Sequence, residues 1–250
     1  PRTNYIIRRA SNLSKESHIL ASNLDLAILV ATLREPVTTT TFIDRFLATA
    51  EAYSVSAALV LNKEDMWDDD DRELADALKN LYTSIGYPVF FVSAATGIGL
   101  KPLKEFISNK ITLLVGNSGV GKSSLINALV PGTELRTGEI SDSHHTGTHT
   151  TTFSEMIDLP EGGAVIDIPG VRGFGTIDFA PEEVGHFFPE IFRTSRDCRY
   201  SDCKHTGEPG CAVIPAVEEH YISESRYASY LSILEEASEE AGADKYRKPF

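Results

Sequence analysis

The chain has 250 residues, of which 42% are hydrophobic, so it can bury the core of one large domain and add a small second one. Its formal net charge of −13 argues against a protein that coats nucleic acid over its whole surface, because contacts with phosphate depend on Lys and Arg. No apolar stretch is long enough to cross a bilayer, and residues 1–5 lack the apolar core of a signal peptide. We therefore expect a cytoplasmic protein with no membrane partner.

Apolar runs of strand length alternate with amphipathic stretches through the first part of the chain. The runs are continuous, which is typical of parallel strands buried on both faces, and they occupy residues 26–31, 57–61, 88–92 and 111–115. Between them, apolar residues at three-and-four spacing predict helices around residues 42–50, 74–82 and 100–107. This order predicts an α/β fold with a mostly parallel sheet, helices on both faces and ligands at the carboxyl ends of the strands.

The remaining segments predict less regular structure. Residues 1–22 look like a linker with one strand near Tyr5–Arg9, and because the sequence begins without Met we expect an N-terminal portion upstream of it. The acidic run 68–71 is expected to cap the helix that follows. Segment 131–152 is rich in Gly, Thr, Ser and His and is expected to be mobile, whereas 153–168 predicts a hairpin. Residues 213–240 predict a long helix whose aromatic side chains serve packing.

One nine-residue stretch matches a phosphate-binding loop. It follows the apolar run 111–115 and leads into a helix, which is the context that the motif requires. Glycines let successive backbone N–H groups point at phosphate oxygens, and the helix N-terminus adds partial positive charge. Lys122 is expected to reach the β- and γ-phosphates, and Ser123 to bind Mg²⁺. An ordinary glycine-rich turn is the alternative. The predicted nucleotide contacts are Gly116, Asn117, Ser118, Gly119, Val120, Gly121, Lys122, Ser123 and Ser124.

Two further stretches predict selectivity for guanine. Asn62, Lys63 and Asp65 fit an Asn-Lys-x-Asp pattern at the end of a buried strand. A carboxylate at Asp65 can accept from the ring N–H and the exocyclic amine of guanine, whereas adenine offers no such pair of donors. Lys63 is expected to lie along the base. The run Ser93, Ala94 and Ala95, at the end of the next strand, is similar to a second guanine-contacting loop.

Segment 149–171 holds the candidates for magnesium binding and hydrolysis. Asp167 and Gly170 fit an Asp-x-x-Gly element, in which the aspartate meets Mg²⁺ and the glycine N–H meets the γ-phosphate. Among the threonines at 150–152 we favour Thr151 as a further Mg²⁺ ligand. Val171 follows Gly170 and has no polar side-chain atom to orient water, so His149 is the candidate catalytic residue. The alternative is that His149 is a solvent-exposed loop residue without a catalytic role. His144 and His145 are weaker candidates.

All three cysteines lie close together near the C-terminus, with a histidine among them. Three thiolates and one imidazole are a closed ligand set for structural zinc, and no open position remains for catalysis. A disulfide would leave one thiol over, which favours metal binding. We expect one structural Zn²⁺ per chain, bound by Cys198, Cys203, His205 and Cys211.

The guanine elements precede the phosphate loop, which reverses the usual order and predicts a circularly permuted GTPase domain. The chain resembles the RsgA (YjeQ-like) family through the stretches 62–65, 116–124, 147–152 and 167–170 and the Cys/His set. The resemblance implies Mg²⁺-dependent GTP hydrolysis to GDP, stimulated by the small (30S) ribosomal subunit in late maturation. It also implies rRNA contacts through zinc and OB-fold modules, the latter largely absent from this chain.

The expected organisation is therefore an OB-fold remnant and linker in residues 1–22, the permuted GTPase domain in 23–176 and a zinc-binding, mainly helical domain in 177–250, acting as a monomer. One alternative is a zinc-containing rRNA-binding module with a regulatory GTP/GDP site and incidental hydrolysis. Another is an ATP-using enzyme, which would prefer adenine.

Overall fold

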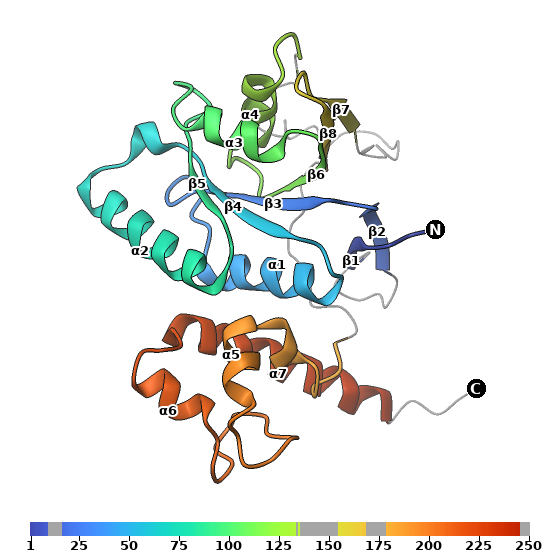
Figure 1. The fold of residues 1–250 in the computed structure, drawn as a ribbon, viewed down its shortest axis with the longest axis vertical. Helices are drawn as coiled ribbons and strands as arrows, with labels where there is room; N and C mark the ends of the chain where they lie inside the picture. Colours follow the sequence, from blue (N-terminus) through green and yellow to red (C-terminus); the bar gives the residue numbers. More distant parts are fainter. Residues whose placement is uncertain (10–16, 134, 136–154, 169–178, 246–250) are drawn as a thin grey trace, which may run out of the picture. The chain divides into compact units, whose positions relative to one another are not determined.

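The computed structural model describes residues 1–9, 17–133, 135, 155–168 and 179–245 (Figure 1). Contacts between Cα atoms divide the chain into two compact units. The first unit comprises Pro1–Ile7, His18–Thr38 and Ser54–Gly173, and the second comprises Arg8–Ser17, Thr39–Tyr53 and Phe174–Phe250. The second unit therefore takes one helix, α1 (Thr40–Ala52), from within the sequence of the first. Within the described segments no helix is both long and apolar enough to cross a membrane.

A six-stranded sheet forms the centre of the first unit, with the strand order β5-β4-β3-β6-β8-β7. Every neighbouring pair is parallel except β7 and β8, which form an antiparallel hairpin at one edge. Ala31 lies opposite Leu61, and Leu29 lies opposite Val115, so the carboxyl ends of β3, β4 and β6 meet at one edge of the sheet. The strands are β3 (Leu26–Ala31), β4 (Ala57–Leu61), β5 (Val89–Phe91), β6 (Lys110–Val115), β7 (Glu155–Asp158) and β8 (Gly163–Asp167).

Apolar side chains on one face of this sheet pack against α3 (Leu100–Ile107) and α4 (Lys122–Leu129). Alternate residues along each strand point to the same face, and Ile28 and Val30 of β3 share a buried cluster with Leu125 of α4. Residues of the other parity, such as Leu29, are buried as well. Burial on both faces explains the continuous apolar runs in the sequence.

The helix α2 (Asp69–Ile85) begins where the acidic run predicts it. Asp68 is the N-cap residue, and its carboxylate accepts the backbone N–H of Asp71 at 2.9 Å. Asp71 in turn accepts the N–H of Asp68, which completes a capping box. The prediction of an acidic cap is therefore confirmed.

The N-terminal residues contain one strand more than the sequence predicts. The strands β1 (Tyr5–Arg9) and β2 (Ser17–Ser22) form a two-stranded sheet, but only the first was expected. The second strand is polar at both ends, so it carries no strong strand signal. Asn4 joins this region to the start of β3 because its side chain both donates to the carbonyl of Leu24 and accepts from its N–H, each at 2.8 Å.

The second unit is helical and has its own core. Apolar side chains from all its helices meet there, and Arg226 forms buried ion pairs with Asp44 at 2.9 Å and Glu190 at 2.6 Å. These pairs join three helices that are far apart in sequence. The elements are α1 (Thr40–Ala52), η2 (Val184–Phe187), α5 (Pro189–Ser195), α6 (Val213–Glu218) and α7 (Glu224–Lys245).

The prediction of one helix over residues 213–240 is wrong, because the structure divides this stretch into α6 and α7. Between the two, His220 takes a positive φ of 61°, and the N–H of Ile222 donates to the carbonyl of Ala216 at 3.0 Å. Ile222 is thereby buried, 2% exposed. Periodicity missed the break because the residues on both sides suit a helix.

Candidate nucleotide-binding and metal sites

The phosphate loop connects β6 to α4, as its motif requires. Two of its glycines are fixed by close neighbours. A Cβ on Gly116, at φ 156°, would lie 2.3 Å from the carbonyl oxygen of Val30, and one on Gly121, at φ 90°, would lie 2.5 Å from Nδ2 of Asn62. No side chain fits at either position without moving backbone or Asn62. The glycines therefore let the loop curl tightly against β3 and β4.

Lys122, the first residue of α4, is buried and turned back over the loop. Its Nζ donates to the carbonyl oxygens of Gly116 at 2.6 Å and Asn117 at 3.0 Å. Burial lowers the pKa of Lys122, and the nearby Asp167 partly opposes this shift. An ammonium group held in a partly desolvated position is well suited to bind an anion, because less water has to be removed from it.

Asn62 holds three loops together at the carboxyl edge of the sheet. It follows β4 and is 2% exposed. Its Nδ2 donates to the carbonyl of Val120 in the phosphate loop at 2.9 Å. Its Oδ1 accepts the N–H of Ala94, after β5, at 3.1 Å. The two predicted guanine stretches and the phosphate loop therefore meet in one place, although they are far apart in the chain.

The other residues of the guanine stretches lie around Asn62. The Ser93 hydroxyl donates to Oδ1 of the exposed Asp65 and accepts the N–H of Thr96 at 3.1 Å, so it orients the Asp65 carboxylate. Lys63 has a positive φ of 66°, and its Nζ donates to the carbonyl of Glu35. Ala95 is exposed beside them. Glu35 was not singled out from the sequence, since it belongs to no motif.

The carboxylate of Asp167, the last residue of β8, fits a cation site. Its Oδ1 is buried and has no hydrogen-bond partner among the described residues. Burial raises the pKa of Asp167, Lys122 lowers it and Glu155 raises it further. A divalent cation would satisfy the orphaned oxygen. Ser123 lies in the first turn of α4. The other candidates, His149, Thr151, Gly170 and Val171, lie outside the described residues, as do His144, His145 and the rest of segment 136–154.

The predicted zinc ligands come together in the second unit. The ligand atoms of Cys198, Cys203, His205 and Cys211 all lie within 4.8 Å of one another. Nδ1 of His205 is 3.7 Å from Sγ of Cys198 and 3.6 Å from Sγ of Cys211, so this nitrogen faces the thiols. Burial and the neighbouring thiols raise the pKa of Cys203 to about 12 when no metal is present to stabilise the thiolate. The donor set therefore suits Zn²⁺, which binds thiolates directly.

Three residues outside the ligand set shape this loop. Burial tends to raise the pKa of Glu208, but hydrogen bonds from backbone N–H groups lower it to about 2. The donors include Lys204 at 2.9 Å and Thr206 at 2.7 Å. From α7, Tyr227 donates to the carbonyl of His205 and Tyr230 to that of Lys204. Packing roles for the tyrosines were predicted, whereas Glu208, whose hydrogen bonds lie within the loop itself, was missed because it belongs to no motif.

This architecture defines the protein class. A phosphate loop after β6, guanine-type loops after β4 and β5, and an aspartate at the end of β8 make a circularly permuted P-loop GTPase fold. The RsgA GTPase family model matches residues 1–177. The chain belongs to the RsgA GTPase family and is a GTPase, as the sequence predicted.

Named relatives and solved structures agree with this assignment. The chain is 60% identical over 253 residues to the small ribosomal subunit biogenesis GTPase RsgA of Porphyromonas gingivalis strain W83, covering all of this chain and 79% of that protein. It is 59% identical over 249 residues to the RsgA of Bacteroides fragilis, with the same coverage. The crystal structure of YjeQ from Thermotoga maritima superposes with a TM-score of 0.78 at 38% identity, over 95% of this chain and 76% of that one. The crystal structure of YloQ, described as a circularly permuted GTPase, superposes with a TM-score of 0.72 at 28% identity. The match covers 100% of this chain and 83% of that one.

Proposed function

We propose that this GTPase acts in late maturation of the small (30S) ribosomal subunit and that the subunit stimulates its hydrolysis of GTP. The relatives are named for biogenesis of this subunit. The observation that carries the nucleotide assignment is the pair of hydrogen bonds from Asn62 to Val120 and Ala94, which brings the guanine-type loops to the phosphate loop. Ribosomal subunits mature in the bacterial cytoplasm, so we propose that the protein works there, as a monomer.

The proposed roles within the site follow from the chemistry of each side chain. Asp65 accepts from guanine, Lys63 lies along the base, and the loop of residues 93–95 approaches the guanine carbonyl. Backbone N–H groups of 116–124 and the Lys122 ammonium bind the phosphates. Magnesium, when bound, neutralises charge between the β- and γ-phosphates. The residues proposed to hold it are Ser123, Thr151 and Asp167, and Gly170 is proposed to contact the γ-phosphate.

His149 is the residue we propose for orienting the attacking water. Val171 occupies the position after Gly170 and is apolar, so another polar group has to meet the water. A His149→Ala variant should lower the turnover number and leave GTP affinity unchanged, whereas Thr148→Ala serves as a neighbouring control. Equal turnover in both variants and the parent would remove His149 from catalysis.

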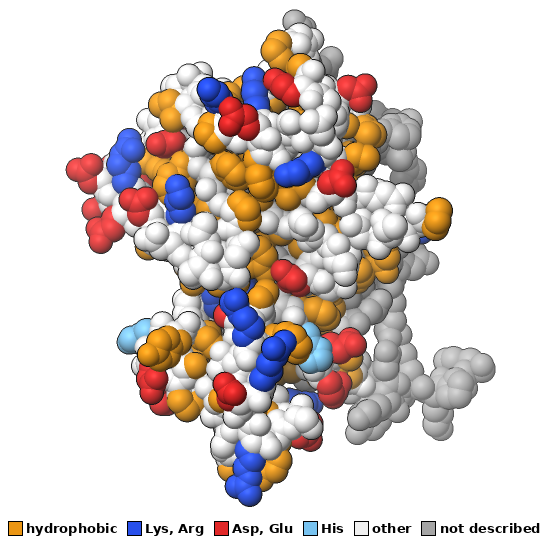
Figure 2. Space-filling model, in the orientation of Figure 1, with side chains coloured by type: hydrophobic (Ala, Val, Ile, Leu, Met, Phe, Trp, Pro, Cys, Tyr) orange, Lys and Arg blue, Asp and Glu red, His pale blue; other side chains and the backbone are white. Residues whose placement is uncertain are grey.

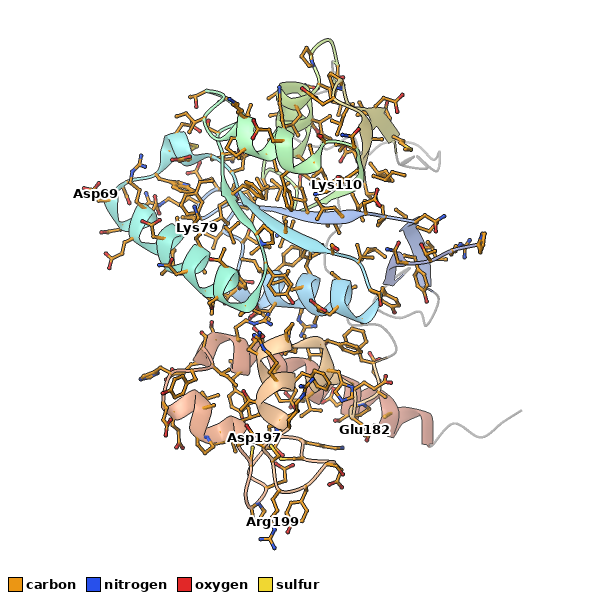
Figure 3. The ribbon with its side chains drawn as sticks, viewed as in Figure 1. Asp69, Lys79, Lys110, Glu182, Asp197 and Arg199 are labelled. Carbon is orange, nitrogen blue, oxygen red and sulfur yellow. The ribbon has the colours of Figure 1, made fainter. Side chains whose placement is uncertain are left out.

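One Zn²⁺ per chain is proposed to hold the loop of Cys198, Cys203, His205 and Cys211 as a structural ion. Beside it, Arg196 lies over the ring of Phe192 at 5.5 Å and Arg199 over that of Tyr200 at 5.4 Å. Figure 2 shows Lys and Arg side chains among hydrophobic ones on this unit, and Figure 3 shows Arg199 at its tip. Such pairs offer positive charge and stacking surfaces, so we propose that this unit contacts rRNA.

We propose a linker in residues 1–22, a permuted GTPase domain in 23–176 and a zinc-binding domain in 177–250, with α1 lying in the compact unit of the C-terminal helices. Multiple-turnover GTP hydrolysis with and without purified small subunits tests the function. We expect a low basal rate and strong stimulation. Equal rates would favour instead an rRNA-binding module with a regulatory nucleotide site. A competition experiment, in which excess ATP or excess GTP displaces bound GTP, tests the choice of base. Displacement by ATP as strong as displacement by GTP would contradict guanine selectivity.

A further inference from the structure

The loop between β3 and α1, residues Thr32–Thr38, is held in one shape by its own hydrogen bonds. The Thr32 N–H donates to Oγ1 of Thr38 at 3.1 Å, and the Thr38 N–H returns to the carbonyl of Thr32 at 2.9 Å. The Thr32 hydroxyl donates to the carbonyl of Pro36 at 2.6 Å. Both threonines are buried, so water does not compete for these bonds. We call Thr32–Thr38 the β3 loop.

The β3 loop reaches both sides of the nucleotide site. On the guanine side, Nζ of Lys63 donates to the carbonyl of Glu35. On the phosphate side, a Cβ built on Gly119 would lie 3.4 Å from Cδ of Pro36, so the proline ring is within contact distance of the exposed tip of the phosphate loop. No sequence motif marks these residues. The loop is thus a neighbour of two nucleotide-binding elements at once.

Arg34 ties the β3 loop to the start of α2. Its guanidinium pairs with the carboxylate of Asp68, and its Nε lies 2.9 Å from Oδ1 of Asp71. Asp71 has only 7% of its side chain exposed, whereas Arg34 and Asp68 are each 51% exposed. These two carboxylates also form the capping box of α2. The guanidinium therefore attaches the loop to a rigid helix start, three residues after Asp65.

We propose that the β3 loop is a positioning element of the nucleotide site, which holds Lys63 in place for the guanine base and so slows the release of guanine nucleotide. Lysine carries a long, mobile side chain, and fixing its ammonium at the Glu35 carbonyl before binding reduces the entropy that ordering would otherwise cost. Arg34 serves as the anchor that keeps the Glu35 carbonyl in reach. This inference rests on the proposed contact between Lys63 and the base.

The test measures how fast a fluorescent GDP analogue leaves the full chain after excess GDP is added. Arg34→Met removes both ion pairs but keeps most of the apolar stem of the side chain. Because half-exposed ion pairs are weak, we expect release to accelerate about two- to fivefold. Asp68→Asn removes one of the two pairs, keeps a capping side chain, and should give a smaller acceleration.

Asp69→Asn is the matched control. It removes the same charge from the same helix end, one residue along the chain. The described residues give Asp69 no ion pair with Arg34, and Figure 3 shows it at the outer start of α2. Its release rate should equal that of the parent protein. An acceleration as large as that of Asp68→Asn would mean that charge at the helix end, and not the anchored loop, governs release.

A double-mutant cycle separates positioning of Lys63 from general stability. Lys63→Met removes the ammonium group, so the Glu35 carbonyl of the β3 loop no longer has a lysine donor to hold. Arg34→Met should accelerate release in the parent but add little in the Lys63→Met background. Equal acceleration in both backgrounds, or none in either, would overturn the inference. If the parent protein itself failed to bind the analogue, the proposed function would fall first, and the two failures are thereby distinguishable.

Discussion

The side-chain amide of Asn62 donates to the carbonyl of Val120 over 2.9 Å, and this contact joins the end of β4 to the phosphate loop. Because Asn62 also accepts the N–H of Ala94, one buried side chain fixes the spacing of three loops. The permuted order of the chain leaves this geometry intact. What the site needs is that the carboxyl ends of β4, β5 and β6 share one edge of the sheet, and their order along the chain does not matter.

Replacement of Asn62 should therefore affect binding and stability together. Asn62→Ala leaves the Val120 carbonyl and the Ala94 N–H without their partner. Loss of such buried bonds should lower the free energy of unfolding by about 1–3 kcal/mol, as measured by urea denaturation. GTP affinity, measured by titration, should fall at least tenfold because the loops are no longer held in register.

Asn4→Ala is the matched control for this prediction. Asn4 makes the same two kinds of hydrogen bond, both with Leu24, at the opposite, amino-terminal end of β3. The Asn4→Ala variant should be less stable than the parent protein but should keep the GTP affinity of the parent. Unchanged affinity in Asn62→Ala, or equal loss in both variants, would contradict the role of Asn62 in the site.

Asp65 is expected to decide which base is bound. In Asp65→Asn an amide replaces the carboxylate and brings a donor where guanine also has a donor, whereas xanthine offers an acceptor there. Competition titrations should show weaker binding of GTP and relatively tighter binding of xanthosine triphosphate. Glu64→Gln removes the same charge one residue earlier and should keep the preference for GTP. If Asp65→Asn behaved like this control, Asp65 would not contact the base.

The strands and the phosphate loop could be predicted because their signals are local. Residues 26–31 and 57–61 are continuous apolar runs, and the glycines at 116 and 121 belong to a motif whose spacing is fixed by phosphate geometry. The Cys/His cluster was predictable for the same reason, since four side chains able to bind a metal fall within fourteen residues, from Cys198 to Cys211.

Features that depend on distant partners could not be predicted. The helix α1 belongs with the C-terminal helices because Asp44 pairs with Arg226, a contact between residues 182 positions apart. The β3 loop shows its importance only through Lys63 and Gly119. Likewise, the strand β2 forms through pairing with β1, and the gap between α6 and α7 is stabilised by burial of Ile222. In each case tertiary contacts override weak local preference.

Removal of zinc should unfold the loop of residues 198–211. Residues 198–211 form no helix or strand, so four metal bonds would be a main constraint on this loop, beside the hydrogen bonds of Glu208 and the two tyrosines. We expect one equivalent of zinc per chain by elemental analysis, and a lower melting temperature after treatment with a chelator under reducing conditions. Cys203→Ser should lower zinc content, whereas Ser201→Ala should retain one equivalent. Full zinc loss without any change in melting or in protease sensitivity of the loop would contradict a structural role.

The two ion-pair sites between α1 and α7 should differ in strength because they differ in burial. Arg226 is fully buried and pairs with both Asp44 and Glu190. Desolvation acts to lower its pKa, but the two carboxylates together raise it. Arg226→Met removes the guanidinium from two buried carboxylates and should cost about 3–5 kcal/mol in the free energy of unfolding of the helical unit. Arg45 joins the same two helices through Glu236, which is 46% exposed.

Arg45→Met therefore serves as the control and should cost less than about 1 kcal/mol by urea denaturation. Asp44→Asn combined with Glu190→Gln should recover part of the stability lost in Arg226→Met, because neutral side chains cost less to bury than unpaired carboxylates. Equal losses for Arg226→Met and Arg45→Met would mean that helix packing, and not the buried charges, holds α1 to α7. No recovery in the triple variant would point to lost contact between Arg226 and the ring of Phe188, over which its guanidinium lies at 4.5 Å.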